Sequence, residues 1–272
     1  MGLVQLLPME GEASWPPSAE SFNSRPLFPG VLPDWVNNHV AQAVIAAALV
    51  IAFWVWMANR QRIVPTRRQF VGEFLYELVR NTIARDVLGH DFRKYLPYLL
   101  AVFSFILVNN LFGQFFLFMF PTFSKIGYAY GLALCSWLLY NAAGIRKWGL
   151  GTYLRKMTLP EGVPVFLWWL IIPLEFLSNF IVRPITLALR LFANLFAGHL
   201  VIMVFVVGGT LLLTAREPIS GFGVPLLNTA GAVSIVFSFA IFALELLVGA
   251  IQAYIFTVLT AQYVSSAIAE EH

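Results

Sequence analysis

Charged side chains are scarce in this sequence. Asp, Glu, Lys and Arg make up 11% of its 272 residues, whereas soluble domains contain about a quarter. Hydrophobic residues reach 59%, and the mean hydropathy is +0.77. A soluble protein of this composition would have too little polar surface to stay dispersed. We therefore expect lipid to be the main solvent, and the predicted fold class is an all-α integral membrane protein.

The sequence also lacks the motifs of several enzyme and cofactor classes. It contains no Walker-type phosphate loop, no HExxH and no GxSxG. Cys135 is the single cysteine, so no internal disulfide is possible, and four scattered histidines do not make a metal site. We expect a protein that is not itself an enzyme, holds no cofactor or metal ion, and binds no nucleic acid.

Hydrophobic residues are gathered in five long runs, at about residues 39–57, 97–120, 127–144, 164–213 and 224–268. Runs of this length predict helices that cross a membrane. Residues 1–37, with four acidic side chains and one arginine, are predicted to be an extracytoplasmic tail. Residues 38–272 are predicted to form one transmembrane domain.

Residues 66–90 follow another pattern. Their apolar members recur at helical spacing: Phe70, Phe74, Leu75, Leu78, Val79 and Ile83. Arginines and glutamates occupy the other face. The segment is therefore predicted to be an amphipathic helix that lies on the membrane surface.

Lys and Arg concentrate in two connecting segments. Residues 60–96 hold eight and residues 145–163 hold four, against three on the opposite side of the membrane. Cytoplasmic loops carry an excess of these residues, so the N-terminus is predicted to lie outside the cell.

The last two apolar runs are too long for one perpendicular crossing. Fifty residues of helix extend about 75 Å, against about 30 Å of hydrocarbon. Each run is therefore either two crossings joined by a tight turn or one steeply inclined helix. Pro173 and Pro184 permit kinks in the first of them without requiring a turn, and hydropathy alone does not decide.

Five ionisable residues lie within these two runs: Glu175, Arg183, Arg190, His199 and Glu245. A charged side chain near the bilayer centre costs about 2.5–3.5 kcal/mol or more, so it needs a partner, water or a function. Arg183 can extend toward the cytoplasmic headgroups. Arg190 has more apolar sequence on both sides and stays charged, so it would drive a nearby carboxylic acid to ionise.

Helical spacing groups the polar neighbours of these charges. Asn194 lies one turn beyond Arg190 on the same face, whereas His199, nine residues on, is rotated by about half a circle. Glu245 and Gln252 are seven residues apart and nearly share a face. A histidine and a glutamate in the membrane, with amides between them, suggest a chain of proton-exchanging and water-ordering groups.

Plainer interpretations stay open for each residue. Arg190 can be the structural ion-pair partner of Glu175 or Glu245, although a functional charge is favoured within a membrane, and His199 can be a packed, hydrogen-bonded residue. Gln252 and Asn194 more often join helices than conduct protons, as can the pair at residues 109–110. Small residues interleave with these groups and let another helix approach closely, among them Gly198 and Gly249.

The stretches ITLALRLFANLFAGHL (185–200) and ELLVGAIQAYIFTVLTAQYVSSAIAEEH (245–272) carry a specific pattern. The arginine lies in LRLFxNxxAG, a QAxIFxxLT stretch follows, and the sequence ends in EEH. With these motifs the sequence resembles subunit a of the F-type ATP synthase over nearly its whole length. The form RPITLALRLFANLFAGH, with the proline-rich acidic tail, is similar to actinobacterial versions.

The resemblance implies roles for individual residues. Arg190 matches the essential arginine of the family, which faces the rotating ring of c subunits. Four residues match positions in or beside the proton path: Asn194, His199, Glu245 and Gln252. The histidine and the acid are exchanged relative to many bacterial members, as in mitochondrial forms, which suggests that they act as a pair. Glu175 lies near an acidic position of the family but one residue out of register.

The resemblance also implies an architecture and partners. It predicts five crossings, the last two long and strongly inclined, with the N-terminus outside and the C-terminus in the cytoplasm of a bacterial cell. The implied partners are the c ring, the peripheral-stalk b subunits, the remainder of the F1Fo complex and membrane lipid. The implied function is a stator with two proton half-channels that couples proton flow to ring rotation and ATP synthesis.

Two other functions stay open. A stand-alone secondary transporter or ion channel would also place charges at the bilayer midplane, and it predicts transport by the purified chain alone. A membrane anchor for the peripheral stalk predicts that an Arg190→Ala variant would still couple.

Overall fold

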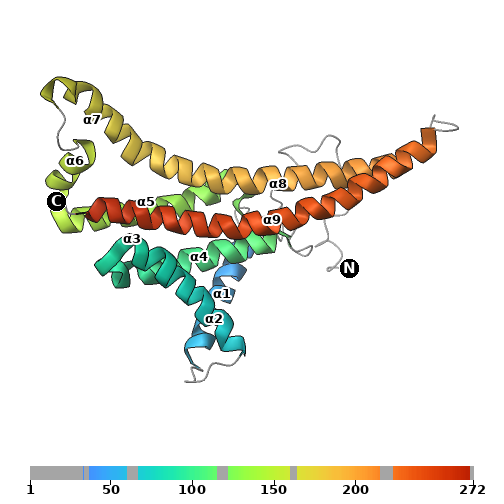
Figure 1. Cartoon of the computed structure of the whole chain (residues 1–272), viewed down its shortest axis with the longest axis horizontal. Helices are drawn as coiled ribbons and strands as arrows, with labels where there is room; N and C mark the ends of the chain where they lie inside the picture. Colours follow the sequence, from blue (N-terminus) through green and yellow to red (C-terminus); the bar gives the residue numbers. More distant parts are fainter. Residues whose placement is uncertain are drawn as a thin grey trace. The chain divides into compact units, whose positions relative to one another are not determined.

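The computed structural model describes residue 33 and residues 37–59, 67–114, 122–159, 164–214 and 223–269. These residues form helices and, within the described ranges, no β-strand element (Figure 1). The longer helices are α1 (Asn38–Ala58), α2 (Arg67–Glu77), α4 (Phe92–Gln114), α5 (Ile126–Trp148), α6 (Leu150–Thr158), α7 (Trp168–Phe176), α8 (Arg183–Thr214) and α9 (Gly223–Ile268). The all-α prediction is confirmed for this part of the chain.

Four helical stretches are long and apolar enough to cross a membrane: Asn38–Ala58, Gln69–Gln114, Val165–Thr214 and Val224–Ile268. They support an integral membrane protein. The predicted third crossing forms α5 but is not among these four, and residues 115–120 of the predicted second crossing lie outside the described residues. The count of five crossings therefore stays a prediction.

The chain divides into two compact units, which are described separately. Unit 1 comprises the described parts of Met1–Ile45, Asn109–Lys125 and Ala193–Ala250. Unit 2 comprises those of Ala46–Val108, Ile126–Phe192 and Ile251–His272.

The predicted amphipathic segment is helical from Arg67 onward. It continues from α2 through a π-helix, η3 (Leu78–Arg85), a short α3 (Asp86–Leu88) and a 3-10 turn, η4 (Gly89–Asp91). Its apolar residues serve two purposes. Phe70 and Phe74 are exposed and stack on each other, with their ring centroids 6.4 Å apart, whereas Val79 and Ile83 are fully buried. Its position on the membrane surface stays a prediction.

The long apolar runs are continuous helices without a tight turn. Val165–Thr214 extends over 50 residues, with a π-helical segment, η8 (Leu177–Val182), between α7 and α8. Helix α9 has 46 residues and would measure about 69 Å. Of the two arrangements left open by hydropathy, the structure contains the single long helix in both cases.

Pro184 explains the irregularity of η8. Proline has no N–H, so a carbonyl one turn earlier loses its intrahelical donor. In unit 2, Trp137 Nε1 donates to Phe180 O at 3.1 Å, and the Tyr140 hydroxyl donates to Asn179 O at 3.1 Å. Side chains of α5 thereby satisfy the carbonyls that the proline leaves free, as a helix in lipid requires.

In unit 1, α8 and α9 approach closely through glycine. A Cβ atom at Gly231 would lie 2.8 Å from Gly209 O, and one at Gly209 would lie 3.0 Å from Gly231 O. Beside this contact, Ser234 Oγ donates to Phe205 O at 2.8 Å. Small residues that bring backbones together are typical of membrane helix packing, and Figure 1 shows the two helices side by side along this stretch.

Candidate functional site

The carboxyl group of Glu245 lies inside unit 1, in the middle of α9. Its side chain is 7% exposed. Gln114 Nε2, at the C-terminal end of α4, donates to Glu245 Oε2 at 3.1 Å. The other oxygen, Oε1, lies against Gly198 of α8, where any Cβ atom would overlap the carboxyl group. Gly198 therefore makes the space that Glu245 occupies.

His199 follows Gly198 and is bonded through both ring nitrogens. Nε2 lies 2.8 Å from Gly113 O, and Nδ1 lies 3.1 Å from Leu195 O. Both partners are carbonyl oxygens, which only accept. A neutral imidazole has one N–H and satisfies one of them, whereas the imidazolium form donates to both. The hydrogen bonding of this ring therefore changes with its protonation state.

The last turn of α4 connects these groups. Asn110 Nδ2 donates to Gly249 O of α9 at 2.8 Å, while its buried Oδ1 has no partner among the described residues. One residue earlier, Asn109 accepts a 3.0 Å hydrogen bond from Thr122. Residues 109–114 thus contact α9 through two amides and α8 through the carbonyl of Gly113. Asn110 thus joins α4 to α9, as one of the open interpretations expected, whereas Asn109 is bonded to the 3-10 turn at Thr122–Ser124.

Arg190 has a different environment in unit 2. Its side chain is exposed, and among the described residues it makes no ion pair or hydrogen bond. The structural ion pair with Glu175 is not formed within unit 2. Instead, Glu175 Oε2 accepts a hydrogen bond from Asn179 Nδ2 at 3.0 Å, and the same amide donates to Met157 O at 2.6 Å.

Arg183 is engaged with α9 rather than free. Its Nη1 donates to Ser266 Oγ at 3.2 Å, and its guanidinium lies 5.2 Å from the ring centroid of Tyr263. Arg183 is therefore a packing residue of unit 2, in contrast to Arg190.

The two predicted amides take different positions. Gln252 is 5% exposed, and its Nε2 has no partner among the described residues. Asn194 is half-buried in unit 1. Within the described residues there is no group of three or more His, Cys, Asp or Glu that could hold a metal ion.

The sequence pattern alone does not mark Gln114 or Gly113 as functional residues. Gln114 is neutral and lies near the end of an apolar run. It therefore does not have the high free-energy cost that marks a charged side chain within a membrane as functional. A usable signal exists, because Gln114 lies four residues after Asn110 and shares its helix face. Gly198 was predicted only as a small residue for close packing, and the structure adds that it accommodates Glu245.

Comparisons with known proteins agree with these motifs. Residues 40–265 match the family model described as ATP synthase A chain. The chain is 47% identical over 237 residues to the ATP synthase subunit a of Nocardioides sp. (strain ATCC BAA-499 / JS614), covering 87% of this chain and 83% of that protein. It is 40% identical over 259 residues to that of Pseudarthrobacter chlorophenolicus, covering 94% of both chains. It is 37% identical over 247 residues to that of Mesorhizobium japonicum, covering 88% of this chain and 90% of that protein.

The family model spans most of the chain, and all three relatives exceed 30% identity over most of their own length. The predicted resemblance is thereby confirmed, and the chain belongs to the ATP synthase A chain family.

Proposed function

We propose that this chain is the proton-translocating stator subunit a of an F-type ATP synthase. Together with family membership, the observation that carries the proposal is the state of Arg190. It is an exposed arginine in a strongly apolar helix, with no ion pair among the described residues.

A charge in this position needs a counterpart from outside the chain. An arginine near the bilayer centre costs about 2.5–3.5 kcal/mol or more unless it is paired or hydrated. A carboxyl group on a ring of c subunits would supply that partner. Because the guanidinium stays charged, it would favour the ionised form of each arriving carboxyl group and cause it to release its proton.

Glu245 and His199 would carry protons between the outside and the ring. Both side chains can gain and lose a proton, and both lie in unit 1 around Gly198. Asn194, also in unit 1, would extend this path as a neutral group that orders water. Gln252 of unit 2 is likewise proposed to order water, because its Nε2 has no partner among the described residues.

The proposed mechanism has two offset half-channels. A proton enters from outside past Glu245 and His199 and neutralises a c-subunit carboxylate, which can then turn into the lipid. After nearly a full rotation that group meets the second half-channel and discharges into the cytoplasm. Arg190 would separate the two routes. The electrical driving force is about 2.3 kcal/mol per charge per 100 mV.

The proposal includes the topology. The two long helices would cross the membrane at a strong incline, since about 69 Å of helix exceeds about 30 Å of hydrocarbon. With α1, α4 and α5 they would make five crossings in a bacterial cell membrane, N-terminus outside and C-terminus in the cytoplasm. The c ring, the b subunits and the remaining F1Fo subunits would be its partners.

Glu175 is proposed to act differently from the other acids. The sequence placed it in the proton path, but its carboxyl group is bonded to Asn179, whose amide also bonds the end of α6. We assign it to anchoring α7 against α6.

The test is an Arg190→Gln variant in the assembled complex, measured as ATP-driven proton pumping into inverted membrane vesicles. Pumping should fall to background while the subunits still co-purify. The matched control is Lys94→Gln, which removes one exposed positive charge elsewhere and should pump normally. Undiminished pumping by Arg190→Gln would contradict the proposal, and proton transport by the purified chain alone would favour a stand-alone transporter.

A further inference from the structure

The orientation of the Glu245 carboxyl group depends on one neutral side chain. Gln114 Nε2 is its only hydrogen-bond donor among the described residues, at 3.1 Å from Oε2. Oε1 is confined on the other side by the backbone of Gly198. Rotation of the carboxyl group would therefore break the bond to Gln114 or press an oxygen into α8.

The turn of α4 that carries Gln114 is bonded to both α8 and α9. Four residues earlier, on the same face of α4, Asn110 donates to Gly249 O of α9 at 2.8 Å. Between them, Gly113 O is bonded to the His199 ring at 2.8 Å. Two consecutive residues of α4, Gly113 and Gln114, are therefore bonded to the imidazole and to the carboxyl group.

We propose that Gln114 is a positioning residue for proton transfer through Glu245, an inference that rests on the proposed function. An amide does not titrate, and its N–H can donate to a carboxylate or to the carbonyl oxygen of the protonated acid. Gln114 thus holds Glu245 in both states without competing for the proton. A carboxylate or a lysine at this position would bind or repel the proton that has to pass.

The experiment compares Gln114→Leu, which keeps a similar volume but removes the amide, with Gln69→Leu. Gln69 is a matched control because its amide also donates to a glutamate four residues on, Glu73, at 2.6 Å. In the assembled complex, Gln114→Leu should lower ATP-driven proton pumping about tenfold, the scale of one hydrogen bond to a charged group. Gln69→Leu should leave pumping within about twofold.

A second measurement separates positioning from a merely structural role. The infrared band of the Glu245 carboxyl group can be assigned as the band that disappears in Glu245→Gln. Its frequency should shift in Gln114→Leu but not in Gln69→Leu. Slower pumping without a band shift, or unchanged pumping, would overturn the inference. Normal pumping by Glu245→Gln would instead overturn the proposed role of Glu245, and this inference with it.

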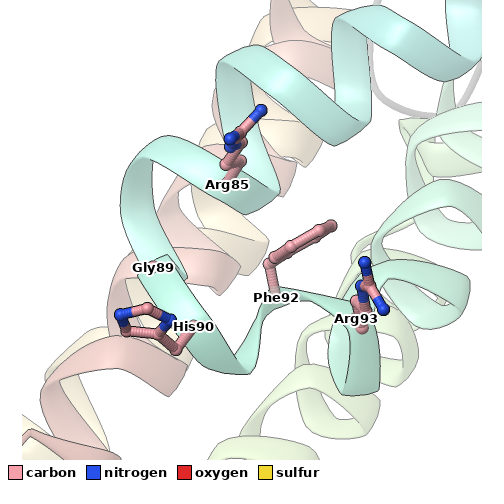
Figure 2. Close-up of a pocket in the computed structure, with 5 residues that line it drawn as sticks. All are labelled: Arg85, Gly89, His90, Phe92 and Arg93. Atoms are coloured by element: carbon pink, nitrogen blue, oxygen red, sulfur yellow. The ribbon is translucent and has the colours of Figure 1, made fainter.

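A second inference comes from a hollow in unit 2, where the amphipathic segment meets α4 (Figure 2). The hollow has a volume of about 520 Å³ and is lined by Arg85, Gly89, His90, Phe92 and Arg93. No carboxylate lines it. Gly89 has a φ of +56°, which turns the chain between η3 and α4. Figure 2 shows the Phe92 ring between the two arginine side chains.

The chemistry of the lining suits a phosphate group at the membrane surface. Arg85 and Arg93 are exposed, and the guanidinium fork matches phosphate oxygens. The apolar run of α4 begins at Tyr95, two residues after Arg93, so the hollow lies where polar sequence gives way to membrane-spanning sequence. We infer that it binds the headgroup phosphate of an anionic phospholipid.

The test uses the complex purified through a tag on this chain and placed in nanodiscs of phosphatidylcholine with added phosphatidylglycerol. The double variant Arg85→Gln/Arg93→Gln should retain phosphatidylglycerol at least about tenfold more weakly. The control Arg80→Gln/Lys94→Gln removes the same charge from residues that do not line the hollow. An equal loss of phosphatidylglycerol in Arg80→Gln/Lys94→Gln would overturn the inference. Displacement of the lipid by inorganic phosphate would overturn it as well.

Discussion

Glu245 and Arg190 are both ionisable residues in long apolar helices, yet their surroundings differ. In unit 1, Glu245 is buried, bonded to Gln114 and fitted against Gly198. In unit 2, Arg190 is exposed and has no bonded partner among the described residues. The Glu245 carboxyl group thus has a hydrogen-bond partner within its own unit, whereas Arg190 has none among the described residues. The difference suggests that Glu245 belongs to an internal path and Arg190 to an interface.

The largest effect is expected at Gly198. In Gly198→Val the side chain would occupy the space of the Glu245 carboxyl group, and overpacking of this kind costs about 1–3 kcal/mol or more. Proton pumping should fall to background, and the Tm of the solubilised complex should drop.

A paired variant sharpens this prediction. Gly198→Val combined with Glu245→Ala removes the carboxyl group that the valine would overlap, so it should recover the Tm but not the pumping. Recovery of both would show that the carboxyl group is only a packing element.

The next effect is expected at His199. His199→Gln removes a group that can carry a proton, and such groups contribute about 10²–10⁴-fold to transfer steps. Pumping should decrease at least about tenfold, with assembly retained. Lys94→Gln, at an exposed basic residue of unit 2 that does not line the hollow, serves as the control, and equal losses of pumping in the two variants would contradict the role of His199.

A smaller effect is expected at Asn110. Asn110→Ala removes the bond to Gly249 O and should cost about 1–2 kcal/mol of stability, seen as a lower Tm. Pumping should decrease less than in Gln114→Leu, because Asn110 does not contact the carboxyl group. A larger loss of pumping in Asn110→Ala than in Gln114→Leu would mean that the hydrogen bond from Asn110 to α9 matters more for pumping than the hydrogen bond from Gln114 to Glu245.

The smallest effect is expected in unit 2, at Tyr153 of α6. Burial raises the pKa of Tyr153 to about 12, so the hydroxyl stays protonated near neutral pH and donates to Asn141 Oδ1 at 2.9 Å. Tyr153→Phe should cost about 1 kcal/mol and leave pumping unchanged at pH 6–8. A pumping defect would place Tyr153 in the proton path.

The sequence allowed the helices and the charged residues to be predicted, but not their contacts. Arg190, His199 and Glu245 stand out because a charge in an apolar run is costly wherever the helix lies. Gln114 does not, since its importance comes from the meeting of α4 with α9, 131 positions apart in the sequence. The π-helix before Pro184 could not be predicted from the sequence either, because it depends on hydrogen-bond donors of α5, Trp137 and Tyr140, which are distant in the sequence.

Disulfide cross-linking in the assembled complex would show whether the partner of Arg190 lies on another subunit. Cysteines would replace Leu189 or Ala193, which are exposed on α8 beside Arg190, in a Cys135→Ser background, and would be paired with cysteines along the c-subunit helix that carries its carboxyl group. We expect cross-links to c from both positions, centred on that carboxyl group. An assembled and coupled complex that forms none would contradict this expectation.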